Sequence, residues 1–172
     1  AQNTVLVDGL APWVAPGLRP WFLPDYSAVQ ATLRVGVEPA GAEFAEASHT
    51  GYRRLSDPVR LSRRVAIFGT GVMVTDFLEG RGEHDVEVRF YLGPGRAVLA
   101  DGEVSLLDEE GTAVASLRPE SSANVAIDLS RGWVATGYGI KRSSQIVRIS
   151  LHGGLPIRVD TDRRPDVNDR YS

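Results

Sequence analysis

The sequence predicts an all-β protein, namely an antiparallel β-sandwich of two large sheets with about ten to thirteen short strands and no significant helix. Short apolar runs recur along the chain and are separated by turn residues about every 8–12 positions. The 172 residues include 18 Gly and 10 Pro, which suits many tight turns. No stretch keeps the apolar period of an amphipathic helix.

The first part of the chain is predicted to open on a strand and then to cross a proline-rich segment. Residues 4–7 are rich in β-branched side chains and stop at the turn pair Asp8-Gly9. Four prolines between Pro12 and Pro24 predict a loop or an edge, because proline cannot donate to a strand ladder. Residues 31–37 alternate and are expected to form a strand, whereas residues 44–52 give a weaker strand signal.

The second part carries the stronger strand signals. Residues 65–68 and 72–77 flank a short Gly-containing loop and predict a hairpin. Residues 86–92 alternate apolar and charged side chains, which is typical of a strand with one buried face. Further strands are expected over residues 97–99, 104–107, 113–117, 125–127 and 146–151. The polar tail, residues 160–172, is expected to fray.

Composition limits the function classes. The net charge of −3 argues against a general affinity for nucleic acid or for anionic membranes. The chain has no Cys, which excludes a disulfide scaffold and a Cys-based zinc site. One domain spanning residues 1–172 is expected. Its abrupt start on a strand favours a segment cut from a longer chain over a processed terminus.

The common catalytic motifs are missing from the sequence, and the three histidines are the first candidates for a functional role. The histidines His49, His84 and His152 are too far apart in sequence for a local metal motif, although a sheet could bring them together. His84 is interpreted either as a strand-start residue that hydrogen-bonds a turn or as a substrate contact. His49 lies beside Gly51-Tyr52 and two arginines, which favours a binding surface about as strongly as a structural role.

An arginine cluster and a group of aromatic residues are the other candidates. Arg53, Arg54, Arg60, Arg63 and Arg64 could hold a carboxylate or sulfate, because guanidinium binds both in a bidentate fork. The alternative is a charged strand edge that prevents edge-to-edge pairing. In the proline-rich segment, Trp13, Trp21 and Phe22 could stack on sugar rings or fill the core beneath a loop.

These residues also fall into a recognisable order. Five sequence segments form a series that is characterised by their order and spacing. The segments are Asn3 to Gly9, His49 to Tyr52, Arg63 to Asp76, Gly80 to Leu92, and Gly132 to Gly139. The series resembles the H-N-T-V-V-V-D-G, H-D-G-Y, R-R-x-(apolar)…V-x-D, G-x-G-x-H and W-V-S…Y-G segments of the C-terminal β-domain of heparinase II/III-like polysaccharide lyases. The resemblance spans roughly residues 2 to 159.

The resemblance implies a parent enzyme with an N-terminal α/α toroid that cleaves uronic-acid-containing polysaccharide by β-elimination. The helical domain would supply the base, so the isolated β-domain is expected to be inactive. The family histidine that comes from the β-domain corresponds to Gln2, which cannot take up a proton. A structural zinc seen in some members would correspond to Thr4, Asp25 and His49, and Thr4 is not a zinc ligand. No zinc or other cofactor is therefore predicted.

The resulting functional hypothesis is a lyase accessory domain that packs on a helical domain and lines the substrate cleft. The predicted substrate-binding residues are Asn3, His49, Tyr52, Arg53, Arg63, Arg64 and His84. The predicted partners are an acidic polysaccharide and the helical domain, and the resemblance implies a periplasmic or secreted protein. Two alternatives stay open, a free carbohydrate-binding module and a structural or assembly domain without a ligand.

Overall fold

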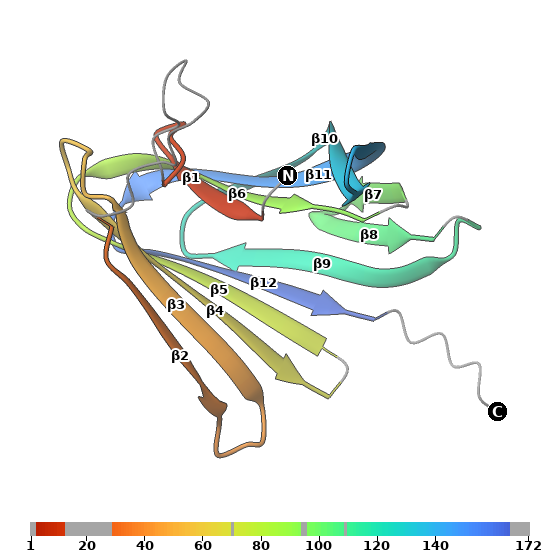
Figure 1. The fold of residues 1–172 in the computed structure, drawn as a ribbon, viewed down its shortest axis with the longest axis horizontal. Helices are drawn as coiled ribbons and strands as arrows, with labels where there is room; N and C mark the ends of the chain where they lie inside the picture. Colours follow the sequence, from red (N-terminus) through yellow and green to blue (C-terminus); the bar gives the residue numbers. More distant parts are fainter. Residues whose placement is uncertain (1–2, 13–28, 70, 94–95, 109, 166–172) are drawn as a thin grey trace.

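The computed structural model describes residues 3–12, 29–69, 71–93, 96–108 and 110–165 (Figure 1). These residues form twelve antiparallel strands in two sheets. The strands are β1 (Thr4–Val7), β2 (Ala31–Val37), β3 (Glu43–Tyr52), β4 (Val59–Phe68), β5 (Gly71–Glu79), β6 (Glu83–Tyr91), β7 (Arg96–Ala100), β8 (Glu103–Leu107), β9 (Ala113–Ser121), β10 (Val125–Gly137), β11 (Ile140–Gly154) and β12 (Ile157–Arg164). Within the described residues there is no helix, and therefore none that is long and apolar enough to cross a membrane. The predicted fold class is confirmed.

The two sheets differ in size. The four-stranded sheet has the order β1-β6-β11-β10, and the eight-stranded sheet has the order β2-β3-β4-β5-β12-β9-β8-β7. Figure 1 shows the four-stranded sheet lying over only one end of strands β2 to β5, whose other ends extend beyond it. The eight-stranded sheet is therefore covered over only part of its surface.

A single core lies between the sheets. Strand alternation points Val5, Val88 and Ile149 inward from the four-stranded sheet, and Leu78 and Val159 inward from the eight-stranded sheet. All five are fully buried. The apolar runs seen in the sequence thus become strands because alternate positions can be buried against a second sheet.

Turn chemistry fixes the chain reversals. Asp8 and Gly9 have φ angles of 52° and 72°, and Asp101 and Gly102 have φ angles of 50° and 75°. Two successive positive φ angles are what a tight hairpin turn requires, and Asp-Gly meets that requirement at little steric cost. The Asp-Gly pairs identified in the sequence therefore end strands as expected.

The chain end differs from the sequence prediction. Residues 160–172 were expected to fray, but β12 continues to Arg164. It pairs with β5 on one side and β9 on the other, so both of its backbone edges are satisfied. Residues 166–172 lie outside the described part of the chain.

Candidate functional site

The seven predicted binding residues do not form one site. Asn3, His49, Tyr52 and Arg63 gather near the start of β1, where the two sheets meet. His84 lies at the opposite end of β1, beside the Asp8 turn. Arg64 follows Arg63 in the same strand and so faces the other side of the sheet, and Arg53 is exposed in the turn after β3.

Arg63 forms a buried ion pair with Asp76 inside the eight-stranded sheet and also contacts the four-stranded sheet. Its Nε and Nη2 donate to the two carboxylate oxygens of Asp76 at 2.7 and 2.8 Å. Its Nη1 donates to the Asn3 carbonyl at 3.0 Å, and its guanidinium lies 5.6 Å from the centre of the Phe90 ring. Asp76 is fully buried and Arg63 is 21% exposed. The guanidinium is therefore occupied by partners within the domain.

Burial raises the pKa of Asp76, and the hydrogen bonds and charge of Arg63 oppose that rise. The Asn3 side chain connects the start of β1 to β6, because its oxygen accepts a hydrogen bond from the Tyr91 backbone N–H at 2.7 Å. This bond satisfies the backbone N–H at the end of β6, beside the start of β1. Asn3 and Arg63 thus have structural roles here, while their predicted contact with a substrate stays a prediction.

Tyr52, one of the predicted substrate-binding residues, lies inside the core of this domain. Its side chain is fully buried in the core, and its hydroxyl donates to the Val5 carbonyl. Burial raises the pKa of the Tyr52 phenol, so the phenol stays protonated. A fully buried, protonated tyrosine suits neither a substrate contact nor a general base. A shift of register between His49 and Tyr52 turns this side chain inward.

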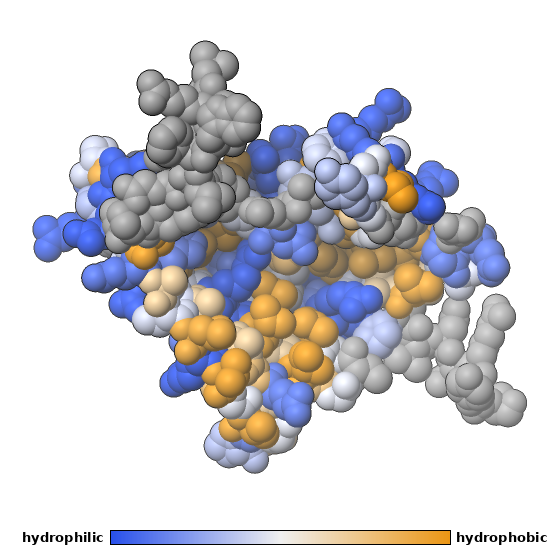
Figure 2. Space-filling view, in the orientation of Figure 1, coloured by the Kyte–Doolittle hydropathy of each residue, from blue (hydrophilic) through white to orange (hydrophobic). Residues whose placement is uncertain are grey.

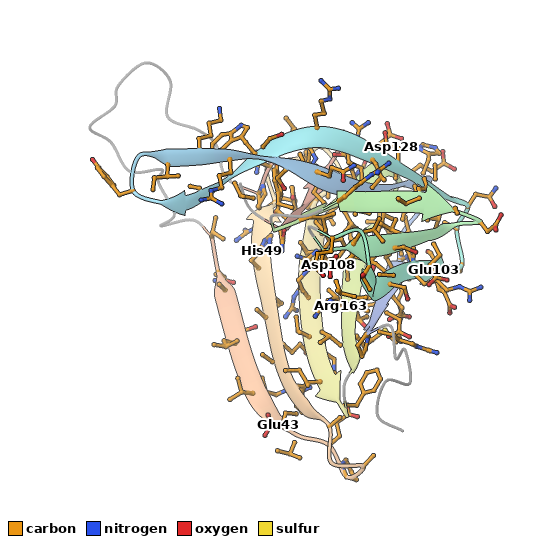
Figure 3. All side chains as sticks on the ribbon, turned by 90° about the vertical axis from the view of Figure 1, so that its right-hand side faces the viewer. Glu43, His49, Glu103, Asp108, Asp128 and Arg163 are labelled. Carbon is orange, nitrogen blue, oxygen red and sulfur yellow. The ribbon has the colours of Figure 1, made fainter. Side chains whose placement is uncertain are left out.

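His49 lies beside Tyr52, in the group of residues near the start of β1. Its ring centre is 5.8 Å from that of Tyr52, and its Nδ1 accepts the Gly51 backbone N–H at 3.2 Å. Burial lowers the pKa of His49, which favours the neutral ring. With Nδ1 acting as an acceptor, the proton of the neutral ring is on Nε2. His49 can therefore offer an N–H donor to a ligand (Figure 3).

The zinc site that the family resemblance implies does not fit the described donors. Thr4 precedes the inward-facing Val5 and so faces the outer side of the four-stranded sheet. His49 pairs with the inward-facing Leu61 in the other sheet. Within the described part of the chain, no three His, Asp or Glu side chains gather as metal ligands. Gln2 and Asp25 lie outside the described residues, so their predicted roles stay predictions.

His84 holds a turn. It is 3% exposed, and its Nδ1 and Nε2 lie 2.8 Å from an Asp8 carboxylate oxygen and 3.1 Å from the Arg81 carbonyl. Both partners are acceptors, so both ring nitrogens donate when the two bonds form. This geometry agrees with the interpretation as a strand-start residue that hydrogen-bonds a turn. Almost none of the His84 surface is free, and its predicted contact with a substrate stays a prediction.

Three other arginines of the sequence cluster, Arg54, Arg60 and Arg64, have partners within the domain, and Arg60 donates to the Ser48 hydroxyl. Arg64 donates to Glu38 and Glu46 and lies 3.9 Å from the centre of the Phe44 ring. Arg54 donates to the carbonyls of Ala11, Pro12 and Gly51. Arg63 and Arg64 thus point to opposite faces, and the sequence cluster does not become one cationic surface. Trp13, Trp21 and Phe22 lie outside the described residues.

The sequence reasoning missed one exposed group, the hairpin of β10 and β11. Trp133 is 45% exposed, and the ring of Tyr138 at the turn is fully exposed. A signal was available, because no Asp or Glu occurs between Asp128 and Asp160, while five Lys or Arg do. In a chain of net charge −3 this segment is locally cationic.

Comparison with known proteins gives the family. The model of the "Heparinase II/III-like, C-terminal" family matches residues 1–168. The chain belongs to this family. No curated protein matches the sequence.

Solved structures of this family's enzymes share the fold. A heparinase III with methylated lysines superposes with a TM-score of 0.72 at 14% identity, over 95% of this chain and 23% of that one. A mutant of the heparan sulfate lyase HepC from Pedobacter heparinus gives 0.69 at 12% identity, over 95% and 24%. Another heparinase III gives 0.67 at 16% identity, over 95% and 23%. This chain therefore spans about a quarter of the length of these relatives.

Proposed function

We propose that this chain is the C-terminal β-domain of a lyase that cleaves uronic-acid-containing polysaccharide by β-elimination. In this proposal the domain packs on a helical domain of the same protein and forms one wall of the substrate cleft. The substrate class follows from the family, whose solved members include a heparan sulfate lyase. A periplasmic or secreted location would follow from such a substrate.

The observation that carries the proposal is an apolar surface that no part of the described domain covers. We call it the inner-face extension. It consists of the side chains that continue the inward face of the eight-stranded sheet beyond the four-stranded sheet, namely Leu33, Val35 and Val37 of β2, Ala45 and Ala47 of β3, Val65 and Ile67 of β4, and Val72 and Val74 of β5. Figure 2 shows a hydrophobic area over the free ends of these strands.

The exposure of these residues is unusual for a sheet that needs a covered face. Leu33, Val35 and Val37 are 73%, 69% and 65% exposed, and Ile67 is 51% exposed. A sheet with an apolar face is stable when a second layer covers it, and large exposed apolar patches mark interaction sites. The relatives' chains are about four times as long as this one, and such a length is enough for a second layer from the same protein.

The same proposal accounts for the lack of a general base among the described residues near the start of β1, namely Asn3, His49, Tyr52 and Arg63. Tyr52 is buried and protonated, and the free nitrogen of His49 carries a proton. β-Elimination requires a group that removes a proton next to a carboxylate. That group would come from the helical domain, while His49 would donate a hydrogen bond from the β-domain.

The test compares this chain with the complete product of its gene. Both are incubated with heparan sulfate, hyaluronan and alginate, and the unsaturated uronate product is followed by its ultraviolet absorbance. Activity of the complete product alone is expected. Activity of the isolated chain, or none from the complete product on any uronate polysaccharide, would contradict the proposal.

A further inference from the structure

The β10–β11 hairpin extends past the core that the rest of the domain forms. Val125, Ile127 and Leu129 of β10 pack against the core. By strand alternation Arg131 and Trp133 continue the same face, but both are exposed. The turn that joins the two strands projects from the sandwich in Figure 3. The hydrophobic core of the described residues includes no side chain of β10 beyond Leu129.

The exposed face combines aromatic and cationic groups. Lys141 pairs with Ala135, so it is the diagonal neighbour of Trp133, and its ammonium lies 4.0 Å from the centre of the indole ring. Arg131 lies two residues before Trp133 on that face, opposite Gln145. Tyr138 stands fully exposed at the turn. At a strand rise of about 3.3 Å per residue, the stripe from Arg131 to Lys141 runs for roughly 13 Å.

The positive charges of the hairpin are not neutralised nearby. Arg131, Lys141 and Arg142 are exposed, and none of them forms an ion pair within the described part of the chain. By contrast, Arg148 further along β11 is paired with Asp128 and lies near Glu87. The hairpin is therefore a cationic projection on a chain whose net charge is −3.

We propose that the face formed by Arg131, Trp133, Tyr138 and Lys141 binds an acidic polysaccharide chain, and that Arg142, on the opposite face of the two-stranded hairpin, adds to its positive charge. Cations attract the carboxylates or sulfates of such a chain, and exposed rings pack against the apolar faces of its sugars. The ligand class rests on the proposed function, but the site does not, because the hairpin carries its charges and rings whatever the remainder of the protein does.

The test measures binding of fluorescently labelled heparan sulfate to the 172-residue chain by anisotropy at several salt concentrations. One variant removes the charges, Arg131→Gln/Lys141→Gln/Arg142→Gln, and a second removes the rings, Trp133→Ala/Tyr138→Ala. The matched control, Arg96→Gln/Arg118→Gln/Arg163→Gln, removes three exposed cations elsewhere, none of them in an ion pair within the described residues. Tyr138→Ala alone serves as a second ring variant, because a fully exposed side chain contributes little to folding.

We expect both hairpin variants to weaken binding by about tenfold, the control to weaken it by less than about threefold, and the charge variant to flatten the salt dependence. Absence of binding by the unmodified chain, or equal losses in hairpin and control variants, would overturn the inference. The same variants in the complete product separate the two proposals. Wild-type KM for heparan sulfate in the hairpin variants would overturn this site alone and leave the lyase function intact.

Discussion

Asp76 has no exposed surface, and Arg63 is the cation that holds its carboxylate. Such a pair contributes little to stability compared with apolar residues of similar volume, but removing one partner leaves a buried charge without compensation. We therefore expect Arg63→Met to lower the free energy of unfolding by about 3 kcal/mol or more. The double variant Arg63→Met/Asp76→Leu should recover most of that loss. Denaturant unfolding of the four proteins of this cycle measures both effects, and a double variant as unstable as the single one would contradict this account.

His49 makes a prediction about pH. Burial lowers its pKa below the ordinary value of 6.5, so between the two values the unfolded chain binds more protons than the folded one. Stability is therefore fully present above pH 6.5 and is lost as the pH falls toward the folded pKa. His49→Asn keeps an acceptor for the Gly51 N–H but does not titrate. We expect its free energy of unfolding to fall less than that of the wild type between pH 7 and pH 5.

The other two histidines serve as the control in that comparison. His84 and His152 are present in both proteins, so the difference between the two pH curves isolates His49. Chemical denaturation at a series of pH values gives the measurement. Parallel curves would contradict the prediction, because they would mean that folding does not change the pKa of His49.

At the scale of the element, β2 is the strand whose exposure demands an explanation. All seven of its residues are exposed, and its apolar side chains belong to the inner-face extension. Because Val35 is 69% exposed, Val35→Lys should change the stability of the isolated chain by about 0.5 kcal/mol or less. Under the proposed function a helical domain covers this face in the complete product, so we expect the same charge to lower its thermal midpoint and its activity.

Val98 provides the matched control for that prediction. It is an exposed valine on β7, the edge strand at the other side of the same sheet, and it lies outside the inner-face extension. Val98→Lys should leave the thermal midpoint and the activity of the complete product unchanged. Equal effects of the two substitutions would show that the docking face lies elsewhere.

At the scale of the whole molecule, the sequence was informative where structure depends on local signals. The hairpin of β4 and β5 and the Asp-Gly turns follow from alternation and from turn chemistry, which act over a few residues. The inward position of Tyr52 depends on a register shift and on a carbonyl 47 residues away, and neither leaves a mark in the local pattern. The opposite orientations of Arg63 and Arg64, however, follow from alternation alone once the strand is accepted.

A whole-molecule prediction concerns cooperativity. Val88 of the four-stranded sheet and Leu78 of the eight-stranded sheet are both fully buried in one core cluster. We expect Leu78→Ala to lower the free energy of unfolding by about 2–5 kcal/mol, because it removes buried apolar contact and leaves a cavity. Leu33→Ala, at a position that is 73% exposed, should cost about 0.5 kcal/mol or less.

The shape of the unfolding curve decides whether the uncovered ends of β2 to β5 belong to the same cooperative unit. Strands β3 to β5 run without interruption from the covered core into the inner-face extension, so their exposed ends cannot lose all order without loosening the buried ends. We therefore expect far-ultraviolet circular dichroism and tyrosine fluorescence to give coincident transitions in denaturant for the wild type and for Leu78→Ala. An earlier transition seen by circular dichroism alone would mean that the free ends unfold separately, and that the helical domain is needed to complete the fold.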